Sequence, residues 1–170
     1  SDMMLAGGGP DDISAKNADS FLDPSVDTYR DLWGGTYNGV TRANAILAAV
    51  ENADYSTYFS TSAEADEFKA QIMGEAYFMR AFLYFRAAKF FGGVPLILEV
   101  NDPRDVARAS FEETFAQIAT DFKKAIETLP NVNQSSIATS EFGHANKWVA
   151  QAYLGRVFLF YTGYMSNMNG

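Results

Sequence analysis

Apolar residues recur at helical spacing over most of the chain, three, four and seven positions apart. This periodicity places them on one face of an α-helix. We expect four main helices, with a short apolar extended segment between the second and the third. The helices are predicted over residues 29–51, 63–91, 110–129 and 144–161, and the extended segment over 94–100. The predicted fold class is all-α, with no sheet larger than a short hairpin.

The predicted helix over 63–91 carries polar residues on two sides. Lys69 and Arg80 share one stripe. The opposite stripe, at ~100° per residue, holds Gln71, Glu75, Arg86 and Lys89. Apolar side chains fill the space between, and a helix with apolar groups on two sides packs between neighbours. The pattern favours a tetratricopeptide-like α-α superhelix of antiparallel helix pairs with long loops, although no clean fixed-period repeat is visible.

Local signals mark the ends of two predicted helices. Several N-cap candidates lie at 60–62, and acidic residues follow them where the helix dipole favours negative charge. Gly92 and Gly93, followed by Pro95, form the matching stop. Ser110 and Glu113 have the spacing of a capping box, which predicts the start of the third helix.

The apolar faces predict one contiguous core. We expect it to contain Phe78, Phe82, Phe85, Phe115, Phe122, Leu154 and Phe158. Residues 1–170 are interpreted as a single helical domain. It consists of a loop over 1–27, which is a candidate ligand-binding edge, and a helical array over 28–164.

Composition narrows the function classes. Aromatic residues make up 15% of the chain, which indicates either a thick aromatic core or an aromatic binding surface. The net charge of -8 argues against nucleic acid and anionic lipid as partners, because both require a basic surface. The absence of cysteine excludes disulfides and thiolate chemistry. No apolar run reaches the ~18 residues that a membrane-spanning helix needs.

Four segments, in chain order, resemble sequence patterns of the SusD/RagB family. Residues 33–44 resemble its W-x3-Y-x2-[IV]-x2-[AC]-N helix. Residues 74–85 and 90–96 resemble its most specific signature, G-E-A-x-F-L-R-A-x-x-Y-F followed by F-G-x-V-P-L. Residues 108–130 and 146–161 are similar to two further helices of the family. The departures from the patterns are Phe122, Trp148 and Gly155.

The resemblance implies a cell-surface function. Members of the family are lipoproteins of the bacterial outer membrane that bind oligosaccharides and deliver them to a TonB-dependent, SusC-like porin. They have no catalytic activity and need no cofactor. They are considerably longer than this chain and begin with a lipidated cysteine. We therefore expect the N-terminal helical piece of a longer protein, attached to the membrane only through a lipid anchor outside this chain.

Sugar capture needs aromatic rings that stack on pyranose faces and polar groups that bond the hydroxyls. The candidate ligand-binding residues are Asp11, Asp12, Lys16, Tyr29, Trp33 and Tyr37. Trp33 is the strongest, because glycan sites of the family commonly use a tryptophan in this region, although a core position in the first helix fits it equally well. The aspartates of the loop over 1–27, Asp11 and Asp12 among them, suit hydrogen bonds to sugar hydroxyls or calcium binding. The alternative is a solvated loop without a ligand.

Other candidates favour structural roles. Tyr55, Tyr58 and Phe59 form an aromatic patch that we interpret as packing at a helix end. Glu75 and Arg86 share one helix stripe, which predicts ion pairing to a neighbouring helix. The single histidine, His144, lacks the partners of a catalytic triad or a zinc site and is expected at the surface.

Two other functions compete with glycan capture. Helical periodicity alone supports a tetratricopeptide-like scaffold that binds proteins and not sugars. A glycoside hydrolase is the weakest hypothesis, because such enzymes need two carboxylates on a rigid frame and the sequence shows no such pair.

Overall fold

The computed structural model describes residues 29–103, 105–132 and 142–169, and among them it contains four helices and no strand. The helices are α2 (Arg30–Asn52), α3 (Ser62–Phe91), α4 (Phe111–Thr128) and α5 (Lys147–Asn169). The all-α prediction is confirmed, and each predicted helix is present.

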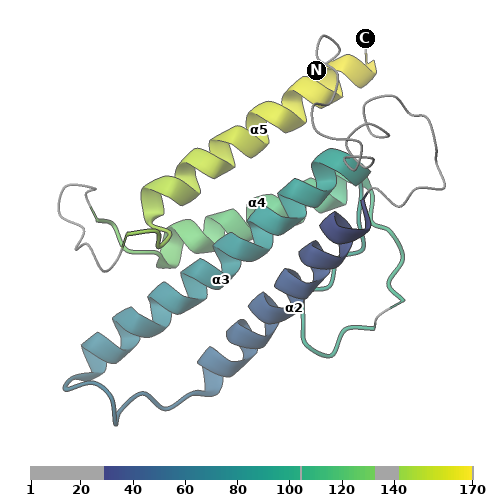
Figure 1. The fold of residues 1–170 in the computed structure, drawn as a ribbon. Helices are drawn as coiled ribbons and strands as arrows, with labels where there is room; N and C mark the ends of the chain where they lie inside the picture. Colours follow the sequence, from purple (N-terminus) through teal and green to yellow (C-terminus); the bar gives the residue numbers. More distant parts are fainter. Residues whose placement is uncertain (1–28, 104, 133–141, 170) are drawn as a thin grey trace, which may run out of the picture. The chain divides into compact units, whose positions relative to one another are not determined.

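The chain divides into two compact units, residues 1–35 and residues 36–170. In the second unit, α3, α4, α5 and the part of α2 from Thr36 onward run in alternating directions, so that consecutive helices are antiparallel (Figure 1). α4 packs against both α3 and α5. The predicted antiparallel pairing is therefore present in this unit.

The predicted helix ends are confirmed at α3 and α4. Thr61 accepts a hydrogen bond from the Glu64 backbone at 3.2 Å, and the Glu64 carboxylate accepts one from Thr61 N at 3.1 Å. Ser110 and Glu113 form the same reciprocal pair at 3.0 and 2.8 Å. α3 ends at Phe91 and is capped by Gly92, whose φ of 71° is a conformation that side chains disfavour.

α5 is longer than the predicted range of 144–161, because the polar, glycine-containing segment after it continues the helix to Asn169. The Thr162 hydroxyl donates to the carbonyl of Phe158 at 2.9 Å. The rings of Tyr161 and Tyr164 stack on Phe111 of α4, with centroids 5.7 and 4.3 Å away. This packing offsets the ~1 kcal/mol that a glycine costs inside a helix.

The core is aromatic and joins α3, α4 and α5. Phe78, Phe85, Phe115 and Phe122 are buried as predicted, and Phe82 and Leu154 pack against them half-buried. The Phe78 and Phe122 rings meet edge to face at 5.5 Å. Phe158 does not belong to this core: it is 64% exposed. The inward face of α5 is made by Tyr153, Val157, Phe160 and Tyr161, which leaves Phe158 exposed beside that face.

Candidate functional site

A buried ion pair lies between α3 and α4. Arg80 is 4% exposed and Asp121 is fully buried. The Nε and Nη2 groups of Arg80 each donate to one carboxylate oxygen of Asp121 at 2.8 Å. Such a two-point contact is the strongest geometry that a guanidinium and a carboxylate adopt.

The ion pair is linked to α2 and to the extended segment after α3. Arg80 Nη1 donates to Asn44 Oδ1 and to the Leu98 carbonyl, both at 2.8 Å. Asn44 Nδ2 in turn donates to the Ile97 carbonyl at 3.0 Å, and Gln117 Nε2 donates to Asp121 Oδ1 at 3.0 Å. Arg80 is therefore a structural centre that holds three helices and one loop together.

Tyr84 holds the same extended segment. The hydroxyl of Tyr84 donates to the Ile97 carbonyl at 2.9 Å and accepts from Ile97 N at 2.8 Å. Burial raises the pKa of Tyr84 to about 12. Burial lowers the pKa of Arg80, but the hydrogen bond and charge of Asp121 outweigh it, so that the net shift is upward and the guanidinium stays charged.

A cavity opens beside this network. Its volume is about 590 Å³, and it is bounded by α2, α3, α4 and the segment 98–101. We call it the network cavity. Asn44, Arg80 and Gln117 reach it from the buried network. The rest of its wall mixes apolar and polar side chains: Leu47, Ala48, Glu51, Met73, Tyr77, Leu98, Glu99, Val100, Asn101, Thr120 and Lys124.

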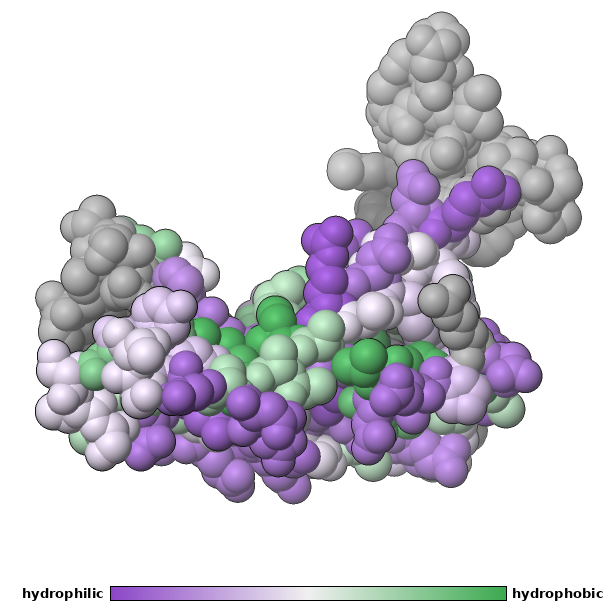
Figure 2. Space-filling view, turned by 90° about the horizontal axis from the view of Figure 1, so that it is seen from below, coloured by the Kyte–Doolittle hydropathy of each residue, from purple (hydrophilic) through white to green (hydrophobic). Residues whose placement is uncertain are grey.

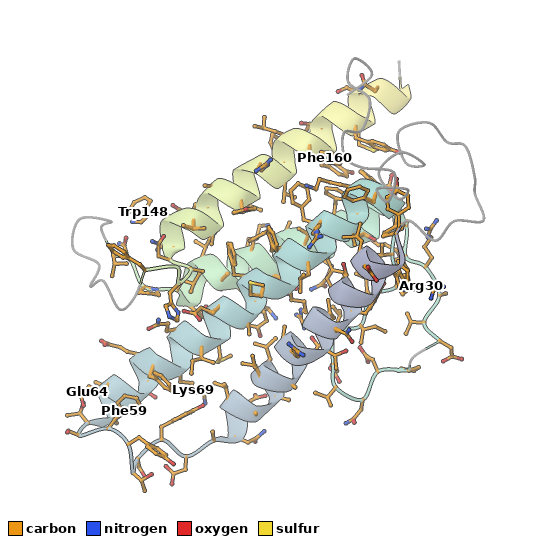
Figure 3. The ribbon with its side chains drawn as sticks, viewed as in Figure 1. Arg30, Phe59, Glu64, Lys69, Trp148 and Phe160 are labelled. Atoms are coloured by element: carbon orange, nitrogen blue, oxygen red, sulfur yellow. The ribbon has the colours of Figure 1, made fainter. Side chains whose placement is uncertain are left out.

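A second hollow lies between α4 and α5 and is mainly apolar. This α4–α5 groove has a volume of about 710 Å³ and contains Phe115, Ile126, Leu154 and Phe158 in its wall. Figure 2 shows that apolar residues also gather along the middle of one face, between hydrophilic ones. On α5, Trp148 is 57% exposed and points away from the ribbon in Figure 3.

The loop between α2 and α3 packs its aromatic rings at the start of α3. Tyr55 and Phe59 lie 5.6 and 5.0 Å from the Phe68 ring, which confirms helix-end packing for these two residues. Tyr58 is 81% exposed and does not share that role. Figure 3 shows Phe59, Glu64 and Lys69 close to the start of α3.

The predicted sugar contacts fall into three groups. Asp11, Asp12 and Lys16 lie outside the described residues. Tyr29 and Trp33 are both exposed and lie one turn apart, with Trp33 N donating to the Tyr29 carbonyl at 2.9 Å.

Tyr37 points its polar end into the protein. Its hydroxyl donates to the Pro95 carbonyl at 2.8 Å, and its ring meets Tyr84 edge to face at 6.4 Å. Burial, followed by the proximity of Tyr84, raises the pKa of Tyr37. This residue helps to hold the extended segment, and a sugar contact by Tyr37 stays a prediction.

The remaining ionisable candidates have local roles. Glu75 lies 2.8 Å from Nδ1 of His144, just before α5, and accepts from Gln71 at 3.3 Å. His144 is at the surface as predicted. Arg86 is exposed and forms no ion pair within the described residues. Those residues contain no cluster of three or more metal-ligating side chains, and none of their helices is long and apolar enough to cross a membrane.

The pairing of Arg80 with Asp121 was not predicted from the sequence. The periodicity places Arg80 on a polar stripe, and Asp121 lies within the helix predicted over 110–129. The available signal is that each lies in one of the family-like motifs, at residues 74–85 and 108–130. Periodicity carries no information on which polar residues meet across helices.

Residues 12–159 match a model of SusD-like proteins that is described as "Starch-binding associating with outer membrane". The chain belongs to the SusD-like family. A SusD-like protein from Bacteroides ovatus is 33% identical to it over 137 residues, which cover 78% of this chain and 22% of the relative. The resemblance of the four motifs is thereby confirmed.

Solved structures of SusD-like proteins share the fold. A laminarin binding SusD-like protein superposes with a TM-score of 0.76 at 25% identity, covering 92% of this chain and 32% of that one. A SusD-like carbohydrate binding protein from Bacteroides fragilis superposes with a TM-score of 0.67 at 29% identity, covering 80% and 25%. The SusD-like chain described here spans about a fifth of the length of the curated relatives that it matches.

Proposed function

We propose that this chain is part of a non-catalytic cell-surface protein that binds oligosaccharides and delivers them to a TonB-dependent, SusC-like transporter. The observation that carries the proposal is the match of residues 12–159 to a family described as starch-binding and associating with the outer membrane. Two similar solved proteins are named as laminarin binding and carbohydrate binding. The outer membrane is the proposed location, with the protein exposed at the cell surface.

We further propose that the sugar contacts of this part of the protein come from the start of α2 and the residues before it. Tyr29 and Trp33 offer exposed rings one helical turn apart. Asp11, Asp12 and Lys16 would supply groups that bond hydroxyls. Because stacking and hydroxyl contacts each contribute modestly, a site of this kind needs several of them together.

A non-catalytic role also agrees with the use of the buried charges. The Asp121 carboxylate accepts hydrogen bonds from Arg80 at 2.8 Å and from Gln117 at 3.0 Å, which engages both of its oxygens in structural contacts. Glycoside hydrolysis needs an available carboxylate pair about 5 to 9.5 Å apart. Asp121 is therefore a poor acid or nucleophile.

The test uses the full-length protein in native gels that contain starch or laminarin. Retardation in at least one gel, without release of reducing sugar, is the expected result. Free migration in a broad panel of polysaccharides would overturn glycan binding, and release of reducing sugar would overturn the non-catalytic role. Co-purification of an outer-membrane porin in mild detergent tests the transporter partner, and its absence would contradict that part.

The α4–α5 groove supports a second candidate function, a scaffold that binds proteins and not sugars. Phe158 lies in the wall of this groove and is 64% exposed. Exposed apolar patches of this kind commonly mark interaction surfaces. Gel retardation separates the two candidates, because a scaffold without sugar affinity migrates normally in every polysaccharide.

A further inference from the structure

The network cavity has the size and the floor of a small-molecule site. Its volume of about 590 Å³ lies within the ~300–1,000 Å³ range of ligand pockets. Arg80, Asn44 and Gln117 lie in its wall and are all tied into the buried network by hydrogen bonds of 2.8 to 3.0 Å. No buried polar side-chain atom of the described residues lacks a partner. The floor is therefore preorganised and does not have to rearrange when a ligand enters.

One aromatic ring stands in the wall of this cavity. Tyr77 is half-buried, and its ring lies 5.6 Å from the Arg80 guanidinium carbon and 4.9 Å from Lys124 Nζ. The Arg80 contact holds the ring from the buried side. Lys124 is an exposed side chain of α4, and its contact with the ring brings an ammonium group to the same cavity.

Other polar side chains in the wall are available to a ligand. Glu51, Glu99 and Asn101 make no side-chain hydrogen bond or ion pair with the part of the chain that the structure describes. Together with Lys124 they bring acceptors and donors to one cavity. Leu47, Met73 and Leu98 line it with apolar surface.

This combination selects a class of ligand. Each sugar hydroxyl both donates and accepts a hydrogen bond, so a sugar can use carboxylate, amide and ammonium groups at once. The C–H faces of the sugar suit the apolar side chains that line the cavity. A phosphate or another anion would meet the carboxylates of Glu51 and Glu99, and of the two cations in the wall Arg80 is already paired with Asp121, which leaves only Lys124 to attract it.

We propose that the network cavity is a second carbohydrate subsite, distinct from the region of Trp33, which takes one neutral sugar residue. Lys124, Glu99 and Asn101 bond its hydroxyls, and the side chains of Leu47, Met73 and Leu98 pack against its apolar face. The proposal rests on the proposed function and adds a second contact region to it. A subsite of this kind contributes a part of the affinity for a long oligosaccharide, and long glycans therefore gain more from it than short ones.

The test measures affinity of the full-length protein for maltohexaose and laminarihexaose by calorimetry. Lys124→Ala and Glu99→Ala are expected to weaken binding of the preferred hexasaccharide three- to tenfold. Lys123→Ala and Glu127→Ala are the matched controls, because both residues are exposed on α4 and neither lies in the wall of this cavity. The controls are expected to bind like the unmodified protein.

A bulky substitution provides an independent measurement. Thr120 is exposed and lies in the wall, so Thr120→Trp is expected to fill the cavity and weaken binding without lowering Tm. A clear fall in Tm, with unchanged binding, would mean that another part of the longer protein fills the cavity and would overturn the subsite.

The outcomes separate this inference from the proposed function. Normal binding by the Lys124 and Glu99 variants, together with loss of binding in Trp33→Ala, overturns the subsite and leaves glycan capture in place. Loss of binding in both sets supports two contact regions. Failure of the unmodified protein to bind either hexasaccharide or any polysaccharide gel overturns both proposals.

Discussion

Arg80 of α3 contacts Asp121 of α4 through two parallel hydrogen bonds of 2.8 Å, although 41 positions separate the two residues in sequence. Asp121 is fully buried, so its carboxylate contacts Arg80 and Gln117 in place of water. Burying two charges gains little over an apolar pair, but removing one partner leaves an unpaired charge in the interior. The pair therefore specifies how α3 and α4 meet.

The first prediction follows from that asymmetry. Arg80→Ala is expected to lower the free energy of unfolding by about 3–5 kcal/mol, because it leaves the Asp121 carboxylate unpaired. Urea denaturation measures the effect. Arg86→Ala is the matched control on the exposed side of α3 and should change stability by less than ~0.5 kcal/mol. Similar effects of the two substitutions would contradict the role of the buried pair.

The second prediction compares two phenylalanines. Phe122 is fully buried and meets both Phe78 and Tyr153, whereas Phe158 is 64% exposed. Phe122→Ala should cost about 3–5 kcal/mol, because the core cannot close the cavity that the ring leaves. Phe158→Ala should cost less than ~1 kcal/mol when this chain is studied alone. A large loss at Phe158 would show that the side chain is covered.

The third prediction concerns alkaline pH. Burial raises the pKa of Tyr84 to about 12, above the value of about 10 that an unfolded chain shows. The neutral phenol thus stabilises the folded state fully below about pH 10, and this contribution is lost as pH rises toward 12. The urea midpoint of unfolding is measured between about pH 9 and about pH 11. With rising pH it should fall more steeply for the unmodified chain than for Tyr84→Phe.

The control for this titration is an exposed phenol. Tyr58 is 81% exposed, so Tyr58→Phe should leave the pH profile of stability unchanged. Identical profiles for Tyr84→Phe and the unmodified chain would mean that Tyr84 titrates normally in the fold.

The fourth prediction concerns the turn after α3. A Cβ at Gly93 would collide with the Ala109 carbonyl, which is backbone and cannot move aside. Gly93→Ala should therefore destabilise the fold by more than Gly92→Ala. At Gly92 nothing lies near a Cβ and only the backbone conformation, with its positive φ of 71°, is unfavourable, at a cost of ~1–3 kcal/mol. Equal thermal unfolding of the two variants would contradict the close approach.

The fifth prediction tests the sugar contact at the start of α2. In the full-length protein, Trp33→Ala should weaken glycan binding at least tenfold, which corresponds to about 1.4 kcal/mol. Trp148→Ala is the matched control, since Trp148 is exposed on α5, far along the sequence. Circular dichroism checks that both variants fold. Normal binding by a folded Trp33→Ala protein would mean that this ring does not contact the glycan.

Local features of the fold could be predicted because they depend on residues close in sequence. The capping boxes at Thr61 and Ser110 and the stop at Gly92 each involve a few neighbouring backbone groups. The helical periodicity likewise predicted four helices within a few residues, apart from the end of α5 at Asn169. The family motifs added the expected class of function, which no periodicity contains.

Only the tertiary structure decided which side chains meet. The sequence pattern puts Arg80 on a polar stripe, as expected of a surface residue. It is nevertheless buried, because Asp121 and Asn44 supply acceptors from two other helices. Phe158 is apolar and is expected in the core, yet its side chain is exposed, because the rotation of α5 against α4 decides which of its residues face inward. Residues distant in sequence form the hydrogen bonds of buried polar groups and determine which face of a helix is packed. The local pattern of one helix contains no information on either.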